Sequence, residues 1–471
     1  MALQSALFLF FFFPLGGLLY WAVPSLRARN GLLLAASLVF YSFGQWQGIP
    51  VLLLSALVST LAGRAMEREK GRRAVLALAV AVHLLLLGAF KYLDFFTASL
   101  NALLGLELPL AHLPLPMGIS FFTFKSIAYV VDAYRAGGSG HGFADVLLYV
   151  SFFPQIGSGP IARFGPFAQQ LTGRTIGAAQ AAQGLRRFIL GFGKKLLIAG
   201  QVAAIADAAF ALGPALDARM AWVGAVAYSL QLYFDFSGYS DMAIGMAAML
   251  GFSTPENFNY PYIAASIRDF WKRWHISLSS WFQDYLYIPL GGNRKGQGRA
   301  MVNRGIVFLL CGLWHGANWT FILWGLWHGV FSAIESAVAA ARKGRPAERS
   351  RRPLLGRALG HVYTLLVVCI GFVIFRAADL TQAGQMLAAM FTAFSPSPAA
   401  TLAWERIAPA AWCAFFGGIL GSLPIVPYLK ERTAGRGWVE AASFVLAAAL
   451  FALCLLAAAG SGFQSFIYAQ F

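Results

Sequence analysis

The sequence predicts an all-α integral membrane protein that crosses the bilayer many times, and three observations indicate this class. Of the 471 residues, 59% are hydrophobic and only 12% are charged, whereas an average soluble domain has about 25% charged residues. Apolar stretches near the ~20 residues that one helical crossing needs recur along the whole chain. The basic residues collect in short runs between these stretches. Helices are the only structure that satisfies so many lipid-exposed backbone groups within each segment.

We expect one integral membrane domain over residues 1–471, with roughly 10–12 transmembrane helices besides re-entrant and interfacial ones. Within it, residues 1–110 form N-terminal helices, 111–340 a core that carries the motifs, and 341–471 C-terminal helices. The candidate spans are 5–24, 31–47, 50–64, 74–90, 116–134, 188–212, 219–250, 303–340 as a broken pair, 355–377, 406–428 and 438–460.

The net charge of +17 is explained by membrane topology. Basic runs next to apolar spans mark cytoplasmic loops and attract anionic headgroups, so a nucleic-acid partner is excluded. This rule places residues 268–304 in the cytoplasm and the N-terminus outside. The first apolar stretch has no basic leader or cleavage site, so we expect it to be a retained helix. The four cysteines stand alone in apolar runs and are expected to be small core residues.

Polar residues interrupt two apolar regions. Residues 152–163 hold two prolines and two glycines, which end a helix and form either an interfacial loop or broken backbone inside the protein. Asp235 and Asp241 lie within a predicted span and are six residues apart, so they are expected to have different partners. Such carboxylates are either functional or hydrogen-bond between helices.

Residues 267–328 concentrate Trp, Arg and three of the seven histidines. After Pro261, aromatic and apolar residues recur at helical spacing from Trp271 to Tyr285, with His275 at the border of this face, which predicts one amphipathic helix in the headgroup plane. His315 lies in an apolar run broken by Gly312 and Gly316. An ionisable residue at membrane depth is a candidate functional residue, although a lone histidine is also often just hydrogen-bonded. We interpret His328 as a supporting residue, and His83, His112, His141 and His361 as structural.

A histidine at membrane depth, a second histidine near the membrane surface and the basic residues around them favour acyl transfer to a hydroxyl group. The chain lacks a Gly-x-Ser-x-Gly elbow, a P-loop, a zinc-protease motif and a dinucleotide fingerprint. A neutral imidazole is suited to removing a proton from a hydroxyl. Nearby basic residues could hold a phosphate-bearing donor.

At these residues the sequence resembles the membrane-bound O-acyltransferase family, specifically its bacterial branch that acetylates secreted polysaccharides such as alginate or peptidoglycan. The resemblance extends from the first helix to about residue 380. Its matching motifs are Pro116–Phe124, Phe153–Gln155 with Gly157–Pro160, Tyr233–Asp241, Asn257–Tyr262, Phe270–Ser279 and Leu313–Gly316.

The resemblance implies a ring of helices around a central tunnel, with His315 as the catalytic general base and His275 as a second active-site histidine. His275 would orient the donor or stabilise the oxyanion. The donor would be acetyl-CoA, used as a co-substrate, with no bound cofactor and no metal. A periplasmic SGNH-type partner would complete transfer to the polysaccharide, which places the protein in the bacterial inner membrane. The predicted substrate-binding residues are Trp274, Lys272, Arg273, Trp314, Asn318, Asp235 and Ser237.

Two other functions remain open from the sequence. An acyl-group or proton-coupled transporter without its own chemistry could use the apolar-embedded carboxylates Asp132, Asp207, Asp235 and Asp241. A structural scaffold that only docks a periplasmic enzyme would tolerate substitution of both His275 and His315.

Overall fold

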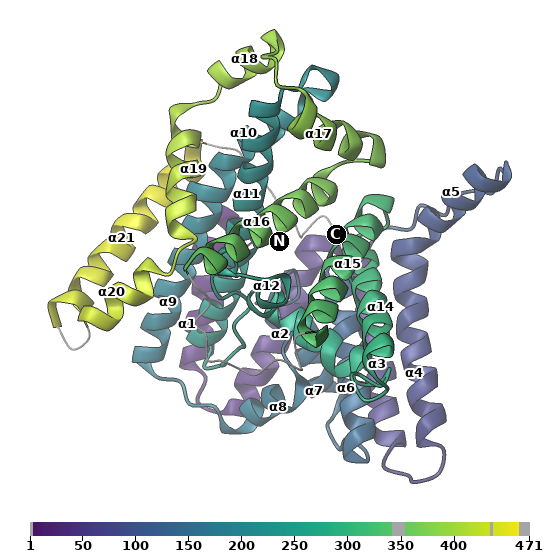
Figure 1. Ribbon diagram of the computed structural model, residues 1–471. Helices are drawn as coiled ribbons and strands as arrows, with labels where there is room; N and C mark the ends of the chain where they lie inside the picture. The colour runs from purple at the N-terminus through teal and green to yellow at the C-terminus, as the bar shows by residue number, and fades with distance from the viewer. Residues whose placement is uncertain (1–2, 342–353, 434–436, 461–471) are drawn as a thin grey trace. The chain divides into compact units, whose positions relative to one another are not determined.

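The computed structural model describes residues 3–341, 354–433 and 437–460 (Figure 1). These ranges contain helices and no strand, so the all-α prediction is confirmed. Backbone contacts divide them into two compact units. The first comprises residues 3–188 and 239–255, and the second comprises residues 189–238 and 256–460.

The first unit is formed mainly by N-terminal helices. They are η1 (Phe8–Phe12), α1 (Phe13–Ala22), α2 (Leu26–Gln45), η2 (Trp46–Gly48), α3 (Ile49–Ala65), α4 (Arg72–Leu87), η3 (Gly88–Tyr92), α5 (Leu93–Leu104), α6 (Ile119–Ala136), α7 (Phe143–Ser151) and α8 (Phe164–Gly173). Two long helices, α9 (Ala178–Gly193) and α11 (Ala218–Met249), contribute residues to both units.

The second unit holds the remaining helices. They are η4 (Lys194–Ala199), α10 (Gly200–Ala211), η5 (Gly213–Ala215), η6 (Pro261–Ile263), α12 (Ile267–Arg273), α13 (Ile276–Phe282), η7 (Gln283–Tyr287), α14 (Gln297–His315), α15 (Trp319–Ala341), α16 (Leu354–Arg376), α17 (Leu380–Thr392), α18 (Pro398–Glu405), α19 (Pro409–Gly421), α20 (Ile425–Thr433) and α21 (Gly437–Gly460).

Six helical stretches among the described residues are long and apolar enough to cross a membrane, and the bent pair α19 and α20 could form a seventh. The six are Leu26–Ala65, Arg72–Leu104, Ala178–Ala211, Trp319–Ala341, Leu354–Arg376 and Gly437–Ala459. A multi-pass membrane protein is thereby confirmed. The number is lower than 10–12 partly because the predicted spans 31–47 and 50–64 lie in one helical stretch. In addition, α6 and α11 carry more polar residues than a simple crossing does.

The interrupted backbone at residues 152–163 lies inside the first unit. It runs between α7 and α8, and Phe152, Phe153 and Ile156 are buried. The ammonium group of buried Lys125 donates to the side-chain oxygen of Gln155 at 3.0 Å. The structure therefore favours broken backbone enclosed by protein over an interfacial loop, because the polar groups of this segment find partners inside the protein.

Helices α3, α4 and α6 pack together in the first unit (Figure 1). Buried His83 of α4 lies between the hydroxyl groups of Ser55 and Ser59 of α3, at 3.2 and 3.1 Å from its two ring nitrogens. Hydrogen bonds of this kind join membrane helices. The structural interpretation of His83 is thus consistent with its contacts.

In the second unit, α14 and α15 form a close hairpin (Figure 1). A Cβ atom at Gly312 would lie 2.3 Å from the Phe321 carbonyl oxygen, and one at Gly325 would lie 2.3 Å from that of Phe308. Small residues let two membrane helices approach this closely. The predicted broken pair at 303–340 is confirmed, because the helix stops at His315 and restarts at Trp319.

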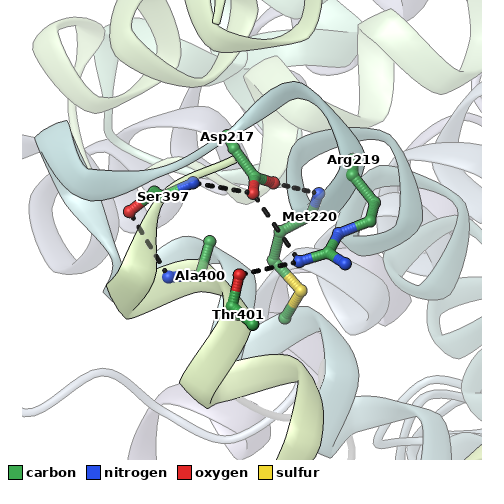
Figure 2. Close-up of polar contacts among 6 residues, drawn as sticks. All are labelled: Asp217, Arg219, Met220, Ser397, Ala400 and Thr401. Carbon is green, nitrogen blue, oxygen red and sulfur yellow. Dashed lines mark hydrogen bonds and ion pairs between the residues drawn. The ribbon is translucent and has the colours of Figure 1, made fainter. Parts of the chain in front are cut away.

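The start of α11 is fixed by one buried carboxylate (Figure 2). Asp217 accepts hydrogen bonds from the backbone N–H of Met220 at 2.8 Å and of Ser397 at 3.3 Å, and it pairs with Arg219 at 3.7 Å. A carboxylate in this position satisfies N–H groups that a helix start leaves open. Asp217 therefore caps α11 and also holds the segment that leads into α18.

The single amphipathic helix predicted after Pro261 is wrong. The segment forms α12 and α13, which are separated at Trp274 and His275. His275 adopts a left-handed backbone conformation with φ of 44°, which an α-helix cannot contain. The apolar spacing reflects burial within the protein, because Trp274 and His275 are buried inside the second unit. A membrane surface is not needed to explain the apolar face.

Candidate active site

His315 is the last residue of α14 and is 2% exposed. Its ring meets those of Trp314, Trp324 and Phe375 edge to face, with centroids 4.9, 5.0 and 5.2 Å away. The helix ends here because Gly316 is extended, and a Cβ at Gly316 would lie 2.2 Å from the Phe321 ring. The glycine therefore allows an aromatic wall to close around the imidazole.

His275 lies in the break between α12 and α13 and is fully buried. Its Nδ1 is 3.1 Å from the side-chain oxygen of Asn257, and its ring makes a T-shaped contact with Phe236, with centroids 4.6 Å apart. Burial lowers the pKa of His275 to about 3, because the charged imidazolium is poorly solvated there. The imidazole is therefore neutral at physiological pH.

Trp314 connects the two histidines. Its ring centroid lies 4.9 Å from that of His315 and 6.0 Å from that of His275. Buried Trp274 stacks on Phe270 at 5.5 Å and contacts Phe372 at 5.2 Å. Four of the predicted site residues, His275, His315, Trp274 and Trp314, thus belong to one buried aromatic region of the second unit.

Asp235 and Ser237 lie on α11 on either side of Phe236, the residue that touches His275. The carboxylate of Asp235 forms an ion pair with Lys195, and both side chains are buried. Ser237 is also buried, and its hydroxyl group has no hydrogen-bond partner in the part of the chain that is described. Its hydroxyl is therefore available to a substrate or to water.

Three other predicted residues lie outside this aromatic region. Arg273 pairs with Asp269 at 3.0 Å and donates to the Asn259 carbonyl oxygen at 3.2 Å, so it braces α12. Lys272 is exposed. Asn318 accepts from the Thr320 N–H and donates to the Ala378 carbonyl oxygen, which makes it a cap of α15.

The sequence did not single out several residues that line the histidines. They include Asn257, Phe236, Trp324 and Phe375, which come from four different segments. Asn257 and Phe236 carried a signal, because they belong to the motifs Asn257–Tyr262 and Tyr233–Asp241. Trp324 also contacts His328 at 5.1 Å, which brings this supporting residue next to the site. Within the described ranges, no group of three His, Cys, Asp or Glu side chains could hold a metal ion.

The four carboxylates that a proton path would use each have a basic partner. Asp235 pairs with Lys195 and Asp241 with Arg187, which confirms that these two have different partners. Asp207 pairs with Arg376 at 2.7 Å, and Asp132 with Arg135 at 3.5 Å. Each carboxylate is thus already engaged by a cation in the described structure, and this arrangement is typical of structural pairs.

The fold and the site together define a multi-pass membrane enzyme with two buried histidines in an aromatic region. A model of the membrane-bound O-acyltransferase (MBOAT) family matches residues 39–376, which is more than half of the chain. The chain belongs to this family.

Three relatives show its position within the family. The "Probable alginate O-acetylase AlgI" of Azotobacter vinelandii is 41% identical over the full length of both chains. The protein of the same name from Pseudomonas aeruginosa is 45% identical, over 83% of this chain and 75% of the relative. The "Peptidoglycan O-acetyltransferase" of Helicobacter pylori is 36% identical, over 82% and 79%. The chain is accordingly an O-acetyltransferase.

Proposed function

We propose that the protein moves an acetyl group from a cytoplasmic acetyl-CoA across the membrane for O-acetylation of a secreted or cell-wall polysaccharide, with His315 as the general base. The observation that carries this proposal is the setting of His315. It is a buried imidazole at a helix break, walled by Trp314, Trp324 and Phe375, in a chain whose relatives are named for alginate and peptidoglycan O-acetylation.

In the proposed step, His315 takes the proton of an acceptor hydroxyl as its oxygen attacks the thioester carbonyl. The carbon–sulfur bond then breaks, and the proton passes to the leaving thiolate. A neutral histidine contributes about 10²- to 10⁴-fold as a general base. Trp314 and Trp274 wall the site, and the exclusion of water by such walls protects the thioester from hydrolysis.

Basic residues at the start of α14 and in the loop before it support a phosphate-bearing donor on the cytoplasmic side. Arg294 and Lys295 are exposed in the loop, Arg299 is exposed in the first turn of α14, and Lys272 is exposed on α12. Exposed basic side chains attract the phosphates of acetyl-CoA. In this proposal the protein lies in the bacterial inner membrane, and the acetyl group passes through the predicted tunnel to the outer face. A periplasmic SGNH-type partner receives it there.

The central experiment replaces His315 by alanine. His315→Ala should abolish acetylation of the cell-surface polymer, measured by mass spectrometry, while the protein remains in the membrane at the normal amount. His141→Ala is the matched control, because His141 is a half-exposed histidine of the first unit. Acetylation that persists in His315→Ala would contradict the role of the base.

The transporter alternative has a different signature. It predicts that Asp235→Asn abolishes function while His315→Ala is silent, and that the purified protein neither hydrolyses acetyl-CoA nor transfers its acetyl group. Release of free thiol from acetyl-CoA by the purified wild-type chain, and not by His315→Ala, would decide for the enzyme.

A further inference from the structure

The side-chain amide of Asn257 can be oriented from its hydrogen bonds. Its Oδ1 accepts from the backbone N–H of Ser277 at 3.3 Å and from the Ser277 hydroxyl at 2.9 Å. A backbone N–H can only donate, so the atom that faces it must be the amide oxygen. A flipped amide would place two donors against each other, and the assignment is therefore fixed by the network.

This orientation determines which nitrogen of His275 carries the proton. Nδ1 lies 3.1 Å from the same oxygen. Because an oxygen can only accept, Nδ1 must be the protonated nitrogen. The imidazole is neutral, so Nε2, on the side of the ring away from Asn257, has a lone pair and no hydrogen.

The backbone holds this arrangement in place. The Ile276 N–H donates to the Asn257 carbonyl oxygen at 2.9 Å, and the Asn259 N–H donates to the Arg273 carbonyl oxygen at 2.9 Å. These two bonds join the segments on both sides of His275 to the Asn257 segment. The left-handed conformation of His275 is thereby imposed by its surroundings, as is common for strained residues at functional sites.

We propose that Asn257 is a positioning residue that holds His275 in the Nδ1-protonated tautomer, so that Nε2 accepts a hydrogen bond from an N–H or O–H group of a substrate. A neutral His275 in this tautomer has no hydrogen on Nε2 to offer to an oxyanion. Of the two roles expected for His275, the proposed tautomer favours orientation of a substrate over stabilisation of an oxyanion. The inference rests on the proposed function only for the identity of the substrates.

The tautomer can be read without any activity. The full chain, labelled with ¹³C and ¹⁵N in histidine and placed in lipid bilayers, should give a His275 signal with the proton on Nδ1. The signal is assigned by its loss in His275→Gln. An Nε2-protonated or doubly protonated ring would overturn the inference, whatever the outcome of the His315 experiment. Conversely, wild-type protein that releases no thiol from acetyl-CoA would contradict the proposed function and leave the tautomer intact.

Three variants test the role of Asn257. Asn257→Leu removes the acceptor and should lower polymer acetylation roughly 10²- to 10⁴-fold, the range for general-base chemistry and for loss of a tautomer-fixing partner. Asn257→Asp keeps an acceptor for all three donors and should restore most of the activity. Ser277→Ala is the matched control, since it removes one hydrogen bond to Asn257 and leaves the hydrogen bond between Asn257 and His275.

Equal activity in Asn257→Leu and the wild type would overturn the inference. So would a failure of Asn257→Asp to exceed Asn257→Leu when both are present in equal folded amounts.

The source of the donated hydrogen bond follows from His275→Gln. If the amide N–H of the acetyl-CoA arm binds Nε2, the KM for acetyl-CoA in thiol release rises. If the hydroxyl of the acceptor binds it, that KM is unchanged and only polymer acetylation falls. A variant with wild-type KM and wild-type polymer acetylation would show that no substrate group uses Nε2.

Discussion

The ammonium group of Lys195 is ion-paired with the carboxylate of Asp235, and both side chains are almost completely buried, at 5% and 2% exposure. The pair joins η4, a π-helical turn, to α11 one residue before Phe236, which contacts His275. A buried pair contributes little net stability compared with apolar residues, but the loss of one partner leaves an uncompensated charge.

Asp235→Asn should therefore lower the free energy of unfolding by about 3–5 kcal/mol, because buried Lys195 loses its ion-pair partner. The double variant Lys195→Met with Asp235→Leu should recover most of this loss. Thermal unfolding in detergent measures both. A double variant as unstable as Asp235→Asn would contradict the structural role of the pair.

Gly312→Ala should destabilise the α14 and α15 hairpin by about 1–3 kcal/mol, as overpacking does. The added methyl group would meet the Phe321 carbonyl oxygen at 2.3 Å. Gly305→Ala on the same helix is the matched control, because no atom lies within 4 Å of its added Cβ. Here alanine should stabilise the helix slightly. Equal unfolding temperatures for the two variants would argue against the close approach.

The pH dependence of stability should reveal His275. Its pKa is about 3 when folded and near 6.5 when unfolded. Above pH 6.5 both states are neutral and His275 has no effect. As the pH falls from 6.5 toward 3, only the unfolded state binds the proton, so stability declines. His275→Gln should decline less steeply over this window in denaturant titrations. Parallel curves would contradict the lowered pKa.

His328→Leu tests the interpretation of His328 as a supporting residue. Both ring nitrogens of this buried side chain lack a hydrogen-bond partner among the described residues, and such groups cost stability. Leucine should leave the unfolding temperature unchanged or raise it, and polymer acetylation should fall far less than in His315→Ala. Complete loss of acetylation in a folded variant would instead make His328 essential.

The class of fold and the family could be predicted from the sequence because apolar spans and motif residues are local signals. The same locality explains why His315 was predicted to lie at a break in an apolar helix pair, since Gly312 and Gly316 flank it. The break at His275 could not be predicted, because Asn257 imposes it from 18 residues away and no helical periodicity records that bond. The sequence predicted polar and charged substrate-binding residues at Lys272, Arg273 and Asn318. It could not show that these residues lie outside the aromatic region, on α12 and at the start of α15.

The backbone at His275 has a consequence for natural variation. The left-handed conformation of His275 favours glycine, although asparagine, aspartate and histidine adopt it more often than other residues do. A change to glycine would relax the turn while removing the ring. A natural variant with glycine at this position would be inactive but more resistant to unfolding by heat or denaturant. Selection for stability alone would therefore remove the histidine.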